Sequence, residues 1–251
     1  LNPYVDYSGA AKVFYILVSM EILTVMFLIP SFTAGSIAGE REKQTLDILL
    51  TTTLTPGEII MGKLMSSISM VFLLVVSSLP IISIVFTIGG IGMEDMLMFM
   101  LEILIISFFI GSMGMLASTM LKKTVQATVC SFAQIVLVCG GTVVVVIVTY
   151  IAAKLYYYNC MGAVGSMPDV SSVLFILLIN PAFTIVQMTA KHCESISVIS
   201  KAAGMLNGSM PSTIVDNWFR LSMISQMIVT VILLRISAIL LKPTRKKKTV
   251  S

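Results

Sequence analysis

Apolar residues run along this chain in long blocks that are separated by short polar stretches. A helix rises 1.5 Å per residue, so about 20 apolar residues cross a bilayer core of roughly 30 Å. Residues 101–110 and 143–148 are mainly apolar at both alternate positions, whereas barrel strands alternate apolar with polar residues. The pattern therefore predicts an all-α, polytopic membrane protein with five spans, at residues 12–38, 64–88, 96–120, 124–153 and 218–241.

The connections between these spans differ in length and polarity. Residues 39–63 form the largest polar insertion among the short connections, and residues 154–217 form a longer region that is only partly apolar. Residues 242–251 form a basic tail. No internal repeat or linker divides the chain, so we expect one transmembrane domain over residues 1–251.

The segment 171–190 tests the number of spans, because it contains an unbroken apolar run at residues 173–179. The run stops at Asn180-Pro181, where proline disfavours continuation of the helix. Its seven residues cover only about 10 Å at helical rise. We therefore expect a re-entrant or interfacial element here and no sixth span.

Small residues recur at four-residue spacing within the predicted spans, an arrangement that allows helices to pack closely in lipid. Three such pairs are Gly35 with Gly39, Ser107 with Gly111, and Gly114 with Ser118. We interpret them as packing positions inside one bundle, and a contact between two copies of the chain is the alternative.

The composition excludes a soluble enzyme. Hydrophobic residues make up 57% of the chain and charged residues 11%, with a mean hydropathy of +1.01, whereas soluble domains average about 25% charged residues. A zincin motif needs two histidines and the chain has one; the G-x-S-x-G motif is absent as well. We expect no catalytic residue, no metal site and no nucleic-acid partner, and the lipid bilayer is the partner that the composition implies.

The distribution of basic residues predicts the orientation, because cytoplasmic loops retain an excess of Lys and Arg. If the C-terminus is inside, ten of the 16 basic residues are cytoplasmic: Arg41, Lys43, Lys63, Lys122, Lys123, Lys242, Arg245, Lys246, Lys247 and Lys248. Five lie outside, four of them in or bordering the long region 154–217. We therefore expect residues 39–63 and 242–251 in the cytoplasm and residues 154–217 outside.

The insertion at residues 39–63 has a legible helical pattern. Leu46, Leu49 and Leu50 share one helical face, while the positions from Glu40 to Lys43 and Asp47 are polar, which predicts a short amphipathic helix. The threonines that follow end this helix. Thr55, Pro56 and Glu58 then fit the N-cap, first and third positions of a new helix that starts with a capping box and runs into the second span.

Residues 35–63 read GSIAGEREKQTLDILLTTTLTPGEIIMGK in one-letter code. This string resembles the signature of the permease subunits of type-2 ATP-binding-cassette (ABC) exporters of bacterial inner membranes, densely so over residues 31–63. The resemblance implies one permease domain with a cytoplasmic coupling helix that docks on a separate ABC ATPase subunit. The candidate coupling residues are Glu40, Arg41, Glu42, Thr45, Leu46, Asp47, Leu49 and Leu50.

The chain departs from this family in the number of spans. The family has six and five are visible here. The first is the one that is missing, and the chain does not begin with Met, so we expect a truncated start.

Residues 57–63 also match the pattern G-x-x-x-x-G-K of a phosphate-binding loop. That loop needs Ser or Thr next, for the magnesium ion, and a preceding strand, but Leu64 follows and the segment is predicted to be a capped helix. We therefore expect no cofactor in this chain, with ATP and magnesium on the partner subunit.

Glu21 and Glu102 are acids inside predicted spans, where a charge costs about 2.5 to 3.5 kcal/mol on insertion scales. Glu21 is about 14 Å in from Lys12 and Glu102 about 9 Å in from Met96, so both lie in the outer half of the membrane. One interpretation is that each faces the bundle, protonated or hydrogen-bonded to Ser or Thr. The other is that they line a translocation path or a cation site.

These observations lead to one functional hypothesis and two rivals. We expect a permease that forms half of the substrate path of an ATP-driven exporter in a bacterial plasma (inner) membrane, beside a second permease copy or a homologous permease. A self-contained ion-coupled transporter or channel that uses Glu21 and Glu102 is the alternative. A structural anchor is disfavoured, since it needs neither buried acids nor a coupling-like insertion. The apolar spans fit drugs, peptides, lipids and ions equally well as substrates.

Overall fold

The computed structural model describes residues 8–51, 53–88, 92–161, 168–193, 197–208 and 210–241. All regular secondary structure in these ranges is helical. The elements are α1 (Ser8–Glu42), α2 (Leu46–Leu50), α3 (Pro56–Ile88), α4 (Met93–Met120), α5 (Thr124–Val136), η1 (Leu137–Gly141), α6 (Thr142–Tyr156), η2 (Tyr157–Met161), η3 (Ser171–Ile179), α7 (Pro181–Cys193), α8 (Val198–Met205), α9 (Ser212–Asp216) and α10 (Trp218–Leu241).

Five helical segments of the described chain are long and apolar enough to cross a membrane. They cover Ile16–Glu42, Pro56–Ile84, Met96–Met120, Thr124–Asn159 and Trp218–Leu241. The prediction of an all-α polytopic protein with five spans is therefore confirmed. The helix of the first span continues through the beginning of the polar insertion, and the helix of the fourth span continues past residue 153.

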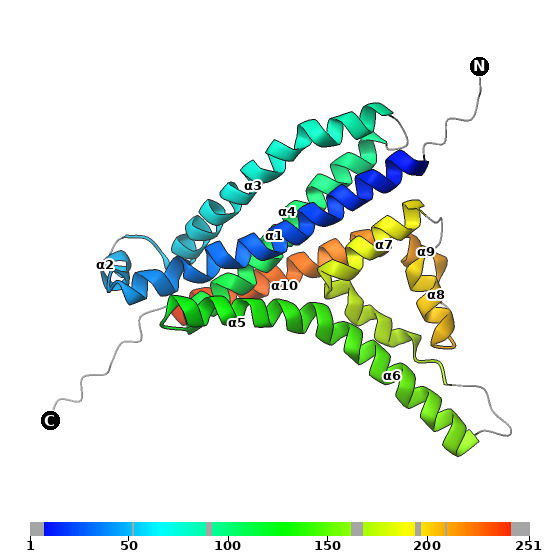
Figure 1. The fold of residues 1–251 in the computed structure, drawn as a ribbon. Helices are drawn as coiled ribbons and strands as arrows, with labels where there is room; N and C mark the ends of the chain where they lie inside the picture. Colours follow the sequence, from blue (N-terminus) through cyan, green and yellow to red (C-terminus); the bar gives the residue numbers. More distant parts are fainter. Residues whose placement is uncertain are drawn as a thin grey trace.

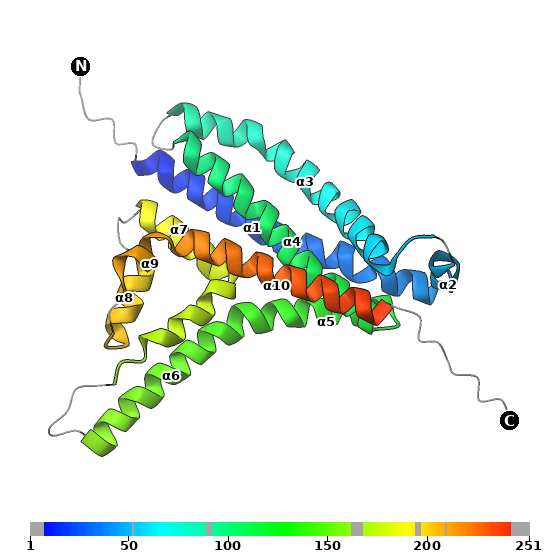
Figure 2. The same cartoon turned by 180° about the vertical axis from the view of Figure 1, so that it is seen from behind.

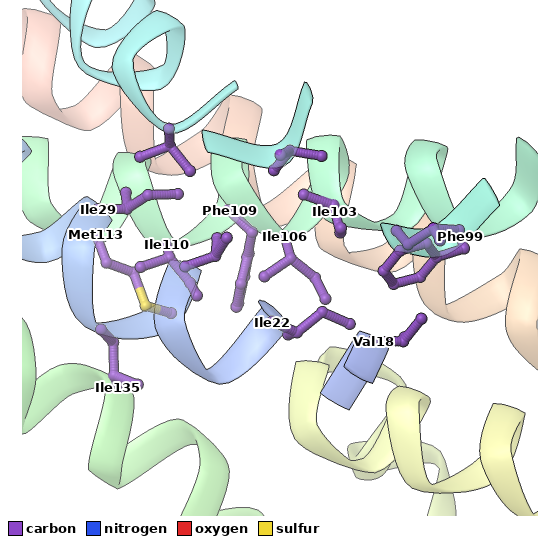
Figure 3. Packing of buried hydrophobic residues seen from close by; sticks show 14 of the residues in the cluster. Val18, Ile22, Ile29, Phe99, Ile103, Ile106, Phe109, Ile110, Met113 and Ile135 are labelled. Atoms are coloured by element: carbon purple, nitrogen blue, oxygen red, sulfur yellow. The ribbon is translucent and has the colours of Figure 1, made fainter. Parts of the chain in front are cut away.

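The helix α4 lies at the centre of the bundle, with α1, α3 and α10 packed around it (Figures 1 and 2). More than half of the apolar stretch of α4 is buried: 56%, compared with 22% for the apolar stretches of α3 and of α10. Figure 3 shows its buried side chains Phe99, Ile106 and Phe109 in one apolar layer with Ile22 of α1. The core thus forms where α4 is enclosed by its neighbours.

Small residues of α4 allow close contact with α1 and α3. A Cβ atom at Gly111 would lie 2.6 Å from Leu64 Cδ1, and one at Gly114 would overlap the side chain of Thr33. One turn further, Ser118 Oγ accepts hydrogen bonds of 2.9 Å from the backbone N–H groups of Ile37 and Ala38. These positions pack inside one chain, as the four-residue spacing predicts.

The fourth span is the least enclosed part of the bundle. It joins α5, η1, α6 and part of η2 into one segment of 36 residues. Only 6% of the apolar stretch of this segment is buried. Its α5 packs against α1 and α4, whereas α6 leads away from them (Figure 1). At 1.5 Å per residue the segment is about 54 Å long, well beyond the bilayer core.

Asn180 explains the π-helical turn η1 in the middle of this span. A π-turn disturbs the regular ladder of backbone bonds and exposes carbonyl groups to other donors. The Asn180 amide donates to Cys139 O at 2.9 Å and to Thr142 Oγ1 at 2.8 Å. Asn180, which is 38 positions from Thr142 in the sequence, therefore supplies hydrogen bonds to the turn where the regular helical ladder is interrupted.

The same residue separates η3 from α7. Asn180 Oδ1 accepts a hydrogen bond of 3.1 Å from the N–H of Phe183, so Asn180 is the N-cap and Pro181 the first residue of α7. The break predicted at Asn180-Pro181 is confirmed, and neither short helix is among the candidate spans.

The η3 end of the molecule has its own small apolar core. Leu174, Leu177, Ile199 and Trp218 are buried there together. Where the chain enters η3, Asp169 accepts a hydrogen bond of 2.9 Å from the N–H of Ser171, which lowers the pKa of the Asp169 carboxyl. This satellite core holds η3 and α8 near the start of α10 (Figure 1).

Candidate functional site

Three consecutive residues at the end of α1 connect this helix to three others. Glu40, Arg41 and Glu42 point to different neighbours, because successive helical positions are rotated by about 100° around the axis. We call this set the α1 joint. Each of its three connections uses a charged side chain, and two of them cap the end of another helix.

Glu40 ties α1 to α3. Its carboxylate accepts a hydrogen bond of 2.7 Å from Lys63 Nζ, and both side chains are about 30% exposed (32% and 28%). The Thr45 hydroxyl donates to the other oxygen of the same carboxylate. Glu40 therefore holds together the end of α1, the start of the second span and the turn between them.

Arg41 ties α1 to the end of α4. Its guanidinium donates to Leu121 O and to Thr119 O, both at 3.2 Å. The last carbonyls of a helix have no partner in their own helix, and a basic side chain there both satisfies them and complements the helix dipole. Arg41 is thus a C-cap supplied from another helix.

Glu42 ties α1 to the start of α5. Its carboxylate accepts hydrogen bonds from the backbone N–H of Thr124 at 3.1 Å and from the Thr124 hydroxyl at 2.7 Å. An acid at a helix N-terminus satisfies a free N–H group and complements the dipole. The turn between α4 and α5 is therefore held from both sides by two adjacent residues of α1.

The predicted amphipathic helix is shorter than the sequence indicated. The pattern predicts one helix over the positions from Glu40 to Leu50, but α1 ends at Glu42 and α2 begins only at Leu46. Gln44 lies between them with a φ of 61°, in the left-handed region that no α-helix continues through. Glu40, Arg41 and Glu42 therefore belong to the first span and not to the short helix.

The leucines of α2 face their own chain. Leu46 is buried, and Leu49 and Leu50 pack against the same apolar cluster, whose other members include Ile60 and Leu64 of α3. They had been expected to need the surface of a partner, and the bundle itself supplies one. The large apolar side chains that are exposed are instead Ile48 of α2, at 69%, and Leu54 in the loop that follows α2, at 51%.

The start of α3 has the predicted capping box. The N–H of Thr55 donates to Glu58 Oε2 at 2.7 Å, and the N–H of Glu58 donates to Thr55 Oγ1 at 3.3 Å. The helix begins at Pro56. Residues 57–63 are therefore helical, and the glycines of the phosphate-loop pattern lie on a helix.

The two intramembrane acids have different surroundings. Glu21 is half-buried and its carboxylate accepts a hydrogen bond of 2.7 Å from Ser78 Oγ of α3, as one interpretation expected. Glu102 is 1% exposed, and no described residue donates a hydrogen bond to either of its oxygens. The two acids lie on different helices, and no described residue forms a hydrogen bond with both of them.

A buried polar cluster lies between α7 and α10, and no pattern in the sequence predicted it. Thr184, Ser222 and Gln226 are connected by hydrogen bonds and are all inaccessible to solvent. Single Ser, Thr and Gln residues in apolar helices carry no sequence signal of this kind. Within the described ranges, no group of three or more His, Cys, Asp or Glu residues is arranged to hold a metal ion.

These features define a polytopic, all-helical membrane protein whose spans are tied together at the α2 end. The sequence model of the family described as ABC-2 family transporter protein matches residues 5–242. The chain therefore belongs to the ABC-2 transporter family, as the resemblance of residues 35–63 indicated, and is a membrane permease component of an ABC transporter. A comparison with curated proteins finds no match.

Proposed function

We propose that this chain is the permease subunit of an ATP-driven exporter and that it works with a separate ABC ATPase, which carries ATP and magnesium, and with a second permease. The family supports the transporter class. The excess of Lys and Arg at the α2 end and in residues 242–251 supports a cytoplasmic position for both, in a bacterial inner membrane.

The observation that carries this proposal is the α1 joint. A force applied to α2 reaches α1 through the short turn at Lys43 and Gln44. From the end of α1 the three charged connections pass it to α3, α4 and α5. ATP-driven closure of the partner would therefore move the ends of four spans together and would not bend one helix alone.

The contact with the ATPase is assigned to the exposed side of α2. Ile48 and Leu54 are large apolar side chains that α2 and its flanking loop leave in contact with water, and Asp47 beside them adds a charge. Burial of an isoleucine side chain is worth about 1.5 to 3 kcal/mol. Leu46, Leu49 and Leu50 hold α2 on the bundle and act as positioning residues.

Ile48→Asp tests this assignment. It places an unpaired charge at the centre of the proposed contact, which an interface core tolerates badly, without touching the apolar cluster under α2. We expect normal insertion and thermal stability, with co-purification of the ATPase reduced more than about tenfold, or more than about 1.4 kcal/mol. Substrate-coupled ATP hydrolysis should fall in parallel.

Val125→Asp is the matched control. Val125 is also apolar and exposed, and it lies in the first turn of α5, where the helix N-terminus favours an acid. This variant should bind the ATPase normally. If Ile48→Asp binds the ATPase and transports as well as the control does, the exposed side of α2 is not the coupling surface.

The alternative of a self-contained ion-coupled transporter keeps one supporting observation, the buried and unpartnered carboxyl of Glu102. It predicts ion-driven flux in proteoliposomes that contain only this chain. Flux that requires the ATPase and ATP would exclude this alternative.

A further inference from the structure

A buried hydrogen-bond network connects α7 and α10. The hydroxyls of Thr184 and Ser222 lie 2.6 Å apart. The Gln226 amide nitrogen donates to Ser222 Oγ at 3.1 Å and to Thr184 Oγ1 at 3.3 Å. Both hydroxyls are also within hydrogen-bond distance of backbone carbonyls, those of Asn180 and Leu178. These bonds direct the amide nitrogen of Gln226 toward the two hydroxyls.

The amide oxygen of Gln226 has no donor within the described ranges. Because the amide nitrogen is directed at Thr184, the oxygen on the other side of the amide group points away from α7. Glu102 adds two more acceptor oxygens that receive no hydrogen bond from any described residue. Glu102 is 1% exposed and Gln226 0%, so all three oxygens are shielded from solvent.

Glu102 is on α4 and Gln226 is on α10, two helices that pack along one seam and run in the same direction (Figure 2). Leu101 and Ile105 line an apolar groove at this seam together with Met223 and Met227 of α10. Glu102 lies between the first two in sequence and Gln226 between the last two. Both are therefore at the depth of the groove, and their burial places them on its inner side.

Acceptor oxygens that lie close together in a dry seam repel one another unless a positive charge or a hydrogen is shared between them. A carboxylic acid supplies such a hydrogen, and a single proton also removes the one negative charge. We propose that Glu102 is a proton-binding site, in which the neutral carboxyl donates its hydrogen to the amide oxygen of Gln226 and so locks α4 to α10. This inference is independent of the exporter assignment.

Among the side chains that the structure describes on the neighbouring helices, none places a positive charge against Glu102, so we assign its neutralisation to a proton. On α10, Arg220 lines the same groove but its side chain is exposed. It lies six residues before Gln226, which is about 9 Å closer to the start of the helix. From α1, Glu21 is bonded to Ser78 of α3. Lys63 of α3 is at the opposite end of the bundle, paired with Glu40. The helix α5 has no charged residue.

Infrared spectroscopy of the full chain in lipid nanodiscs tests the proposal. We expect the carbonyl stretch of a neutral carboxylic acid at neutral pH, lost in Glu102→Gln and shifted in Gln226→Leu, which removes the acceptor. Glu21→Gln is the matched control, since it neutralises the other intramembrane acid and should leave the Glu102 band in place. If Glu102→Gln does not change the carboxylic acid band, or if no such band exists at neutral pH, the proposal is wrong.

The melting temperature gives a second readout. Only the folded state binds this proton at neutral pH, so the stability that it supplies is present at lower pH and is lost as pH rises. The wild type and Glu21→Gln should melt at lower temperature as pH rises, while Glu102→Gln should lack this dependence. If Na⁺, compared with K⁺ at constant pH, raises the melting temperature of the wild type but not of Glu102→Gln, a metal cation occupies the site and the proton proposal fails.

Discussion

The two ends of this bundle are held together by different kinds of contact. At the α2 end, charged side chains of the α1 joint bind helix ends and a lysine at defined distances. At the end where α10 begins, an apolar cluster around Trp218 holds η3 and α8, and α6 leads away from the other spans (Figure 1).

The difference bears on how each end can move. Hydrogen bonds to charged groups are directional, so the α2 end transmits a displacement from one helix to the next. Apolar packing is not directional, and its strength depends on the area that is buried. The α2 end is therefore suited to receive a force, and the opposite end to rearrange in response.

The largest expected effect is at the apolar end. Trp218 is 1% exposed and lies 6.3 Å from the ring of Phe175 and 6.4 Å from that of Phe183. Trp218→Ala should cost about 3 to 5 kcal/mol of stability, because it leaves a cavity in the small core. Thermal unfolding in detergent measures the loss, and binding of the ATPase should be retained.

Trp218→Phe is the control for that variant. The indole N–H of Trp218 is buried and has no acceptor among the described residues, so phenylalanine removes an unpaired donor while keeping an aromatic ring. Its stability should lie much nearer to that of the wild type. If both variants unfold equally early, the ring packing is not what holds this end.

An intermediate effect on stability is expected at Asn180, which donates a hydrogen bond to the π-turn of the fourth span. Asn180→Leu removes the bonds to Cys139 O and Thr142 Oγ1 and the N-cap of α7, which together should cost about 1 to 3 kcal/mol. Hydrogen exchange at residues 137–141 should increase. Asn159→Leu, at an exposed asparagine of η2, should change stability by less than about 0.5 kcal/mol. An unchanged exchange rate in Asn180→Leu would show that Asn180 does not hold the π-turn.

The smallest effect on stability is expected at the α1 joint. Glu40 and Lys63 are partly exposed, so a double-mutant cycle with Glu40→Gln and Lys63→Met should give a coupling energy of about 0.2 to 1 kcal/mol. Either single variant should nevertheless reduce substrate-coupled ATP hydrolysis more than stability. The exchange Glu40→Lys with Lys63→Glu should restore it. If substrate-coupled ATP hydrolysis is normal in both single variants, the Glu40–Lys63 connection of the α1 joint has no role in transport.

Local patterns in the sequence were sufficient for the five spans, for the start of α3 and for the break before α7. The five spans follow from apolar length, and the capping box from Thr55 to Glu58 and the break at Asn180-Pro181 follow from side chains that act within three or four residues. The small residues at the α1 and α4 contact were also recognisable from their spacing. The spans, the capping box and the break are each decided by neighbours on the same helix or turn.

The connections between elements were decided only by the tertiary structure. Glu40 and Lys63 are 23 positions apart and Glu42 and Thr124 are 82 apart, so no helical period relates them. The leucines of α2 illustrate the same limit, because an apolar face in sequence does not say whether its own bundle or a partner covers it. Glu102 and Gln226 are on separate helices, and only the packing of α4 against α10 brings these two helices together.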